Sequence, residues 1–586
     1  MNEPRSSRRA LLGAVAGGTA ALAGCGSDSG GTDDGIADSA DAFGHVFANI
    51  PDEVSLNPWA VGYPSNFAPL LFENLTFRTP TGRVLAPLVE RVSRDGGHVE
   101  VRLADGYSWW NSDDVTARDL WVGERIRALL GRRTHGEATV VGERRIRFDF
   151  ERPTARELVL SARLNGVLNA PRWHYDSWRQ RLADASNGDE REAVGAELRS
   201  TQIPLEEAME VGLGCGPYEL TEVSVNRLLL SRYDDHPRSD EISVPRLWFP
   251  VAQRQRSNQL IARGDIDGGQ GVISREAYDT PDHIQQLARY RTANGTKLVL
   301  NWRNPHLARR NVRRAIRCAL PLDDIVRNAG WGNPVRTQCG MTAPPAERWL
   351  PDSLRESLHD YPSDRERAAS FMREAGYTKE GETWVSPEGE PASLVVLSPL
   401  WTDWLDASRT VHRALSEFGF ETEFEQRTTT AFLTVVQDGT FGILPWWTNG
   451  YPHAAYDPTA TNFASLGYGV AGEREEPLLG KPRSATIPEE PGALSVTEGR
   501  EFDVLDAWET LRAPDEEGAA AATELFARWW NYDLPDIDIA TGISGVWGNV
   551  RDFRWPETDD PRYRQVGPSN GATYHLLKAG AIESVK

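Results

Sequence analysis

The length of the stretch from residue 42 to residue 586 most constrains the fold, because it is too long for one hydrophobic core. Single cores stop growing at about 250–300 residues, so we expect two or more domains or lobes. Short apolar runs typical of strands alternate with amphipathic segments typical of helices, which predicts an α/β fold. No internal repeat interrupts this alternation.

The first 25 residues resemble an export signal that is cut and lipidated. An adjacent arginine pair, Arg8 and Arg9, precedes a short apolar stretch at residues 10–23, as in twin-arginine signals. The stretch ends in Leu-Ala-Gly before Cys25, which resembles a lipobox. It is shorter than the roughly 20 residues that a membrane helix needs. Residues 1–24 are therefore predicted to be the signal peptide, with Cys25 as the lipidated residue.

A tract rich in Gly, Ser and Asp follows at residues 25–41. Such a tract has too little apolar surface to order itself and is typical of a flexible linker. We expect it to join a lipid anchor at Cys25 to a folded body at the extracellular face of the cell membrane.

The composition is strongly acidic. The chain has 64 Lys+Arg and 85 Asp+Glu, giving a net charge of −21 and a pI near 5.1. Nucleic-acid phosphates would be repelled, so we expect no nucleic-acid partner. An acidic surface with more Arg than Lys suits solubility at high salt and predicts a halophilic, haloarchaeal source.

Neither cysteines nor histidines form a pattern typical of a metal site. Cys215, Cys318 and Cys339 have no CxxC spacing, and an odd number cannot all pair within one chain. Buried free thiols are the simplest expectation, and one disulfide with one free thiol is the alternative. The eleven histidines show no HExxH or HxxxH. We expect no metal and no cofactor.

Local signals predict several elements. Thr116 and Asp119 have capping-box spacing before a helix over 117–131, and Ser363 to Glu366 repeat the device before a helix ended by Gly376. Further helices are predicted over 255–263 and 405–418. Strands are predicted at residues 145–150, 228–232, 297–302, 393–397 and 420–424.

Nine short motifs occur in one order along the chain. They are Ser55-Leu56-Asn57-Pro58, Leu71-Phe72-Glu73-Asn74-Leu75, Leu85-Ala86-Pro87-Leu88-Val89-Glu90, Val101 to Tyr107, Asp114 to Leu120, Gly212 to Tyr218, Gly264-Asp265-Ile266-Asp267, Asn311 to Ile316 and Ala375-Gly376-Tyr377. In this order they resemble the extracellular solute-binding proteins of family 5, the oligopeptide and dipeptide receptors of ABC importers. The resemblance covers roughly residues 43–560.

The resemblance implies a two-lobed periplasmic-binding-protein-like fold that closes about a hinge and traps a ligand. Lobe I would hold residues 42–290, with residues 500–586 returning to it, and lobe II would hold residues 291–499. The expected partners are a small-molecule or peptide ligand and the transmembrane permease subunits of an ABC transporter. The protein is expected to act as a monomer and not as an enzyme.

Two motifs carry a physical interpretation of their own. Gly214, Gly216 and Pro217 predict a tight turn that enters a strand at Tyr218. The family's usual Thr between these glycines is Cys215 here, and we interpret its thiol as packed rather than nucleophilic. The run from Gly264 to Asp267 would end a helix and form a solvated acidic corner.

Both loops that hold a free peptide's ends in such receptors lack the expected charge here. An aspartate often follows a tryptophan to pair with the peptide ammonium group, but this position falls on Asn449 or Gly450, ahead of Tyr451. The loop that can carry an arginine for the carboxylate reads Ser398 to Trp404 without a cation. A free dipeptide is therefore a doubtful ligand.

Four tryptophans near these loops offer flat apolar faces with N–H groups: Trp401, Trp404, Trp446 and Trp447. Such faces suit sugar rings, aromatic solutes, or capped and longer peptides. We expect some of the four to belong to the core, and Trp401 and Trp447 to line the cleft. The proposed ligand-binding set is Trp401, Trp446, Trp447, Asn449 and Tyr451.

Two other classes of function compete with solute capture for transport. A hydrolase would need a nucleophile with a base, a carboxylate pair or a metal set. Since no GxSxG, SxxK or HExxH occurs, we expect no catalytic residue. A sensory receptor that binds without transport shares the fold and stays open. The ligand itself, whether peptide, sugar or another uncharged solute, is also left open.

Overall fold

The chain divides into two compact units. The computed structural model describes residues 42–47, 51–60, 62–78, 84–95, 97–131, 137–150, 159–160, 164–252, 254–270, 281–449, 479–512, 516–564 and 572–585. Unit 1 comprises residues 1–79, 83–290 and 544–586, and unit 2 comprises residues 80–82 and 291–543. Two boundaries fall inside long strands, β13 (Ile284–Leu300) and β22 (Asp536–Asn549).

The chain was expected to return to the first lobe at residue 500, but the structure places this return later. Strand β21 (Gly499–Asp503) pairs with β20 (Ser484–Pro488), and α18 (Glu516–Asp533) packs against β20. Because these contacts are made within unit 2, residues 500–543 belong to unit 2. The chain returns to unit 1 only at Ser544.

The described residues of unit 1 include three sheets of three or four strands. Their strand orders are β1 (Phe43–Gly44), β11 (Arg246–Pro250), β10 (Arg227–Arg232), β9 (Tyr218–Val223); β4 (Val89–Asp95), β5 (His98–Leu103), β7 (Arg145–Asp149), β6 (Glu137–Gly142); and β3 (Val84–Leu85), β2 (Asn74–Arg78), β8 (Gly166–Val167). Strand β12 (Gly268–Gln270) pairs with β22, and β23 (Phe553–Arg554) pairs with β24 (Glu583–Ser584).

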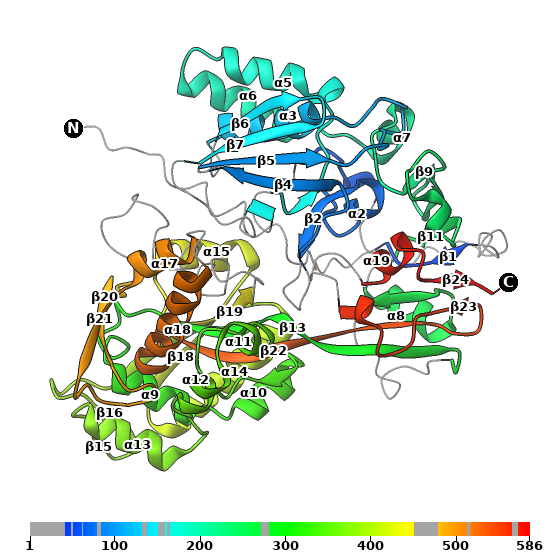
Figure 1. Cartoon of the computed structure of the whole chain (residues 1–586). Coiled ribbons are helices and arrows are strands. Elements are labelled where there is room, and N and C mark those ends of the chain that lie inside the picture. The colour runs from blue at the N-terminus through cyan, green and yellow to red at the C-terminus, as the bar shows by residue number, and fades with distance from the viewer. Residues whose placement is uncertain are drawn as a thin grey trace. The chain divides into compact units, whose positions relative to one another are not determined.

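Seven helices are described in unit 1. They are α2 (Ala68–Leu71), α3 (Ala117–Leu129), α5 (Arg172–Asp184), α6 (Gly188–Ser200), α7 (Leu205–Val211), α8 (Arg254–Arg263) and α19 (Ala572–Lys578), with 3-10 turns at Pro51–Glu53, Ser239–Glu241 and Pro561–Arg564. Figure 1 shows α3, α5 and α6 lying together beside strands β4 to β7. Buried and exposed residues alternate along β5, as expected for an antiparallel strand with one solvated face.

The capping box at Thr116 is confirmed. The Thr116 backbone N–H and hydroxyl both donate to Asp119 Oδ2, at 2.7 and 2.8 Å, and α3 begins at the next residue, Ala117. Asp119 is fully buried, and its other oxygen accepts from the Arg172 N–H of α5. The cap therefore also joins two helices.

Unit 2 is built on a mixed sheet. Its strand order is β22, β13, β19 (Ile443–Asn449), β17 (Ser393–Pro399), β18 (Glu421–Arg427), with β14 (Asn333–Pro334) beside β22. Strand β12 of unit 1 pairs only with the last residues of β22, which also belong to unit 1. Strands β17, β18 and β19 are parallel, and β13 is antiparallel to β19. Strand β13 has 17 residues. Its last four, Lys297 to Leu300, overlap the strand predicted at residues 297–302.

Nine described helices accompany this sheet within unit 2: α9 (Arg310–Ala319), α10 (Leu322–Ala329), α11 (Ala343–Trp349), α12 (Asp352–Ser357), α13 (Arg365–Glu374), α14 (Thr402–Phe418), α15 (Thr429–Asp438), α17 (Val504–Arg512) and α18. A small hairpin joins β15 (Thr378–Glu380) to β16 (Thr383–Val385). Helix α14 ends at Gly419, whose φ of 116° is easy only for glycine. Strand β17 is largely buried because α14 and α15 pack on it.

The predicted cap of α13 is displaced by one residue. Asp364, not Ser363, caps the helix, since its Oδ1 accepts from the N–H groups of Glu366 and Arg367 at 2.8 and 3.1 Å. The Ser363 hydroxyl instead donates to the Leu320 carbonyl. A carboxylate is an equally good cap, and the serine is engaged by tertiary contact.

The turn from Gly214 to Pro217 lies directly before β9, as predicted. The physical reason why it needs glycines differs from the one expected. Neither Gly214 nor Gly216 has a positive φ. A Cβ at Gly214 would collide with the Trp110 ring, and one at Gly216 with the backbone of Leu70 and Leu71. Close approach, not a left-handed conformation, therefore requires glycine here.

Cys215, Cys318 and Cys339 are buried free thiols. Burial raises the pKa of Cys215 far above its usual value, in agreement with a packed thiol.

The prediction that Gly264 to Asp267 form a solvated corner is wrong for Asp267. This partly buried carboxylate accepts from the Gly44 N–H and from Asn549 Nδ2, each at 2.8 Å, and so ties three segments together.

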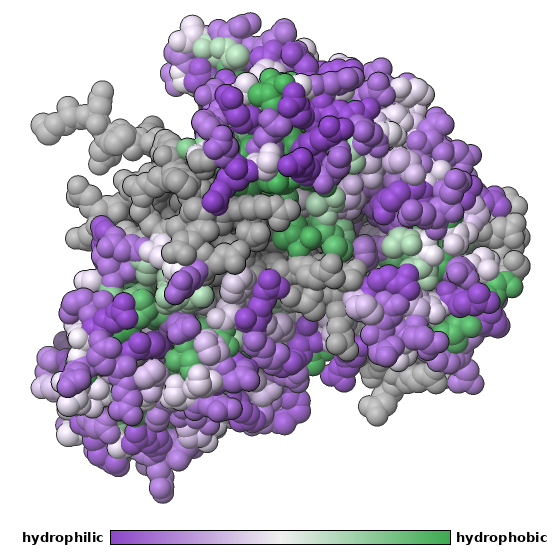
Figure 2. All heavy atoms as spheres, in the orientation of Figure 1, coloured by the Kyte–Doolittle hydropathy of each residue, from purple (hydrophilic) through white to green (hydrophobic). Residues whose placement is uncertain are grey.

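Polar and charged side chains cover most of the face seen in Figure 2, in keeping with the acidic composition. None of the helices described combines the length and apolar character that a bilayer crossing requires.

Candidate functional site

The four tryptophans singled out in the sequence come together in unit 2. Trp401 caps α14, Trp404 lies in its first turn, and Trp446 and Trp447 lie in β19. Helix α14 follows the end of β17, which is parallel to β19. The carboxyl ends of parallel strands lie at one edge of a sheet. Trp401 and Trp446 therefore lie close together although they are 45 positions apart in the sequence. In open α/β sheets this edge is where ligands commonly bind.

The rings form one aromatic cluster. The centroid of Trp404 lies 4.9 Å from that of Trp401 and 4.4 Å from that of Trp447. Trp401 and Trp447 are 5.3 Å apart with their planes tilted by 36°. Phe432 of α15 stacks on Trp446 at 6.3 Å and closes the inner side. These distances are those of favourable aromatic pairs.

Burial divides the four rings into two pairs. Trp404 and Trp446 are only 2% and 6% exposed and belong to an apolar core with Val299. Trp401 and Trp447 are half-buried and pack against that core. The inner pair thus supports an outer pair whose rings are held side by side.

The other predicted residues are placed only in part. Asn449 is the last residue of β19 and pairs with Asn294 of β13. Tyr451 lies outside the described residues, as do Arg8, Arg9 and Cys25. Trp446, which was proposed to bind ligand, lies in the interior of the cluster.

A buried ion cluster in the same sheet was not predicted from the sequence. Asp536, at the start of β22, accepts from Lys297 Nζ at 3.0 Å and from Lys481 Nζ at 2.7 Å. The Leu300 N–H donates to the same carboxylate at 3.0 Å. All three charged side chains are at most 4% exposed.

Two opposing effects set the protonation of this cluster. Burial alone would raise the pKa of Asp536, but the two lysines hold it below its usual value. Burial raises the pKa of Asp538, two residues on, to about 7, although the Gly340 N–H donates to it at 2.9 Å. Burial also lowers the pKa of Lys297 to about 8.

The only sequence signal for this cluster is a lysine inside an apolar strand. Lys297 precedes Leu298, Val299 and Leu300 in β13, where a charged residue is unusual. Its partner Asp536 lies 239 positions away, and no spacing rule connects them.

The comparisons with known proteins agree on the family and the fold. The family model for bacterial extracellular solute-binding proteins, family 5 (middle), matches residues 69–468. No curated protein sequence is significantly similar to the chain.

Solved structures of similar fold include three whose ligands or names are informative. An oligopeptide-binding protein of Thermotoga maritima has a TM-score of 0.69 at 17% identity, over 92% of this chain and 98% of that chain. AppA of Bacillus subtilis, in complex with a nonapeptide, has 0.61 at 13%, over 93% and 100%. NikA of Brucella suis, in complex with Fe(III)-EDTA, has 0.63 at 18%, over 88% and 96%. At these identities the likeness establishes the two-lobed fold.

Proposed function

We propose that this chain, which belongs to the bacterial extracellular solute-binding proteins of family 5, captures an uncharged or weakly charged solute by ring stacking for an ABC importer. Members of this family bind peptides or other solutes as the receptors of such importers. The observation that carries the ligand class is the outer tryptophan pair, Trp401 and Trp447, held at 5.3 Å on a buried aromatic base.

The ligand class follows from what the two loops supply. Indole faces bind the apolar faces of sugar rings, aromatic solutes and the side chains of longer peptides. The residue expected to pair with a free ammonium group is Asn449 or Gly450 and not an aspartate. Without that charge, a free dipeptide gains little orientation. A Thermotoga maritima relative was solved with mannohexaose bound, and AppA with a nonapeptide, so this fold admits both sugars and long peptides.

Native mass spectrometry of the purified protein tests this proposal directly. We expect a co-purifying oligosaccharide or a capped or longer peptide, released intact by mild denaturation. A free dipeptide bound at micromolar affinity would contradict the ligand class. Turnover of the ligand that disappears on changing one residue would contradict solute capture itself.

The substitution Asn449→Asp separates the two remaining ligand classes. A new carboxylate helps only a ligand with an ammonium group, and otherwise it costs desolvation. Tighter binding of free peptides by the variant would favour a pocket of peptide-receptor type. Weaker binding of the co-purified ligand would favour an uncharged solute.

The mechanism we infer is closure of two lobes on the ligand, lobe I from residues 42–290 and the C-terminal return and lobe II from residue 291, followed by delivery to a permease. Strands β13 and β22 support this inference, because each continues from one unit into the other. A ligand that binds the closed state better selects it. Small-angle scattering with and without ligand checks closure. Loss of uptake on deleting the permease gene separates transport from a sensory role.

We also propose that the protein is exported through a twin-arginine signal and held by lipid at Cys25, at the surface of a halophilic cell. The signal-like residues 1–25 and the net charge of −21 support this. Cys25→Ser should release the protein into the medium or block processing. Replacing Arg8 and Arg9 by lysines should block export, since a receptor reads the arginine pair. An unaltered membrane fraction for Cys25→Ser would contradict the anchor.

A further inference from the structure

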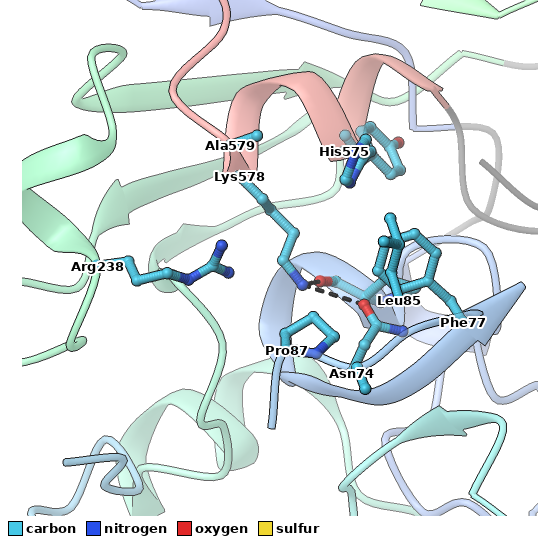
Figure 3. Close-up of a pocket in the computed structure, with 11 residues that line it drawn as sticks. Asn74, Phe77, Leu85, Pro87, Arg238, His575, Lys578 and Ala579 are labelled. Atoms are coloured by element: carbon cyan, nitrogen blue, oxygen red, sulfur yellow. Dashed lines mark hydrogen bonds between the residues drawn. The ribbon is translucent and has the colours of Figure 1, made fainter. Parts of the chain in front are cut away.

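A pocket lies wholly within unit 1, whereas the tryptophan cluster belongs to unit 2. It has a volume of about 310 Å³ and is formed by β2, β3, the loop at Arg238 and the C-terminal helix α19. Figure 3 shows Phe77 and Leu85 on one side and Arg238 on the other. This volume falls at the lower end of the range for small-ligand sites, about 300–1,000 Å³.

The walls of the pocket are mostly apolar. Six residues form them: Pro69, Phe77, Leu85, Ala86, Pro87 and Tyr574. The His575 ring packs edge-on against Phe77 at 5.2 Å, and burial lowers the pKa of His575 to about 4, so it is neutral near pH 7. An apolar ligand body would replace water against these surfaces.

The polar lining of the pocket includes hydrogen-bond donors. Asn74 is 4% exposed, and its Oδ1 accepts from Lys578 Nζ at 3.1 Å. This bond fixes the orientation of the amide, so Nδ2 is the free end. Within the described residues, Asn74 Nδ2 is buried and has no hydrogen-bond partner. An unpartnered buried donor is costly unless a ligand or water satisfies it.

Among the described residues that line the pocket there are two cations and no carboxylate. Arg238 and Lys578 are both lining residues. Arg238 Nε is likewise buried and without a partner among the described residues. The nearby carboxylate of Glu73 is fully buried behind them and is occupied by donors. Its oxygens accept from the Asn74 N–H, Lys578 Nζ, His236 Nε2 and Arg238 Nη2 at 2.8–3.3 Å.

We propose that this pocket binds a small organic anion, a monocarboxylate with an apolar body. The carboxylate would accept from Asn74 Nδ2 and lie near the Arg238 guanidinium. The body would lie against Phe77, Leu85 and Pro87. A charged acceptor meets unpaired donors there, whereas an ammonium group would meet two cations and no carboxylate among the described lining residues.

Titration of the full chain with phenylacetate tests the proposal, with phenylacetamide and benzylamine as the neutral and cationic matches. We expect one saturable site per chain for phenylacetate. Its affinity should exceed that of phenylacetamide by about tenfold or more, since hydrogen bonds to charged groups are the stronger ones. Equal affinity for the amide or the amine, or no saturation at millimolar phenylacetate, would overturn the proposal.

Variants locate the binding. Leu85→Trp should fill the pocket and abolish phenylacetate binding, and Arg238→Gln should weaken it about tenfold. Arg102→Gln removes an exposed arginine of the same unit, which pairs with Glu90, and should leave affinity unchanged. Trp447→Ala should also leave it unchanged, which separates this pocket from the proposed solute site.

A second filling variant guards against misfolding. If Leu85→Trp lowers the melting temperature sharply, Ala579→Leu fills the pocket from the turn after α19 and should give the same loss of phenylacetate binding. Unchanged phenylacetate affinity in a folded filling variant would overturn the proposal. Loss of binding in Trp447→Ala with the filling variants unaffected would assign the anion to the solute site instead.

Discussion

Lys578 of the C-terminal helix donates to Glu73 Oε1 at 2.9 Å, across 505 positions of sequence. Glu73 is fully buried, and His236 and Arg238 contact its other oxygen. Burial alone would raise the pKa of Glu73, but Lys578, His236 and Arg238 hold it well below its usual value of 4.5. The pair joins the motif at Leu71 to Leu75 to the far end of the chain.

Glu73→Gln should therefore destabilise unit 1 by about 3–5 kcal/mol at pH 7, because it leaves the Lys578 charge buried without its partner. The pKa of Glu73 is lower in the folded than in the unfolded state, so the ionised carboxylate stabilises the fold at pH values above the unfolded pKa. This stabilisation is lost as the pH falls through the folded pKa. The difference between wild type and variant should thus shrink below about pH 4.5. Urea unfolding across pH 3–7 measures it, with the exposed Glu90→Gln as a control near zero. A difference that does not change with pH would contradict the assignment.

The two tryptophan pairs should respond differently to truncation. Trp401→Ala and Trp447→Ala each remove a stacking face worth about 1–3 kcal/mol, so ligand affinity should fall roughly 5- to 150-fold while the protein stays folded. Trp404→Ala should instead cost about 3–5 kcal/mol of stability, as for other buried aromatics. Calorimetric titration of the co-purified ligand and thermal unfolding separate the two effects. The surface assignment fails if both outer variants unfold, or if both bind as wild type does.

Removing the acid of the unit 2 ion cluster should be strongly destabilising. Asp536→Ala leaves Lys297 and Lys481 buried side by side, and breaking such a pair typically costs about 3–5 kcal/mol. Asp324→Ala, which removes an exposed ion pair with Arg327, should change stability by less than about 1 kcal/mol. Equal unfolding free energies for the two variants would contradict a structural role for Asp536.

The buried thiols should be inert in the native state. Burial raises the pKa of Cys318 to about 11 and that of Cys215 further. Thiolate is the reactive form, so iodoacetamide at pH 8 should leave both unmodified until the protein is unfolded. Peptide mass spectrometry before and after denaturation measures this. Rapid native alkylation of Cys215 would contradict its packing.

The sequence was informative where the cause is local. Thr116 with Asp119 marks the start of α3, and Gly376 marks the end of α13, through contacts a few residues long, and both helix ends lie where these signals predict. Ser363 shows the limit of such signals. It has the right spacing for a cap, but Leu320 engages its hydroxyl and Asp364 takes the role.

Long-range packing explains what the sequence could not predict. Helical spacing puts Trp404 on the same face of α14 as the buried Ala407 and Val411, whereas Trp401 precedes the helix. Contacts with Phe432 and Trp446, distant in sequence, complete the enclosure of the Trp404 ring. Lys297 lies 239 positions from its partner Asp536, and Lys578 of the α19 pocket wall lies 505 positions from its partner Glu73. The sequence analysis placed the return of the chain to unit 1 too early, at residue 500, for the same reason. The pairing of β21 with β20 keeps residues 499–503 in unit 2.

The bond between Glu73 and Lys578 has a consequence for the order in which the protein matures. Apart from residues 80–82, unit 2 is one continuous stretch, whereas unit 1 needs α19 from beyond it. A ribosome therefore completes unit 2 before it has made the lysine that neutralises Glu73. Until then the nascent unit 1 lacks both the Lys578 partner of Glu73 and the α19 side chains of its core, so its packing can be completed only after translation has passed α19.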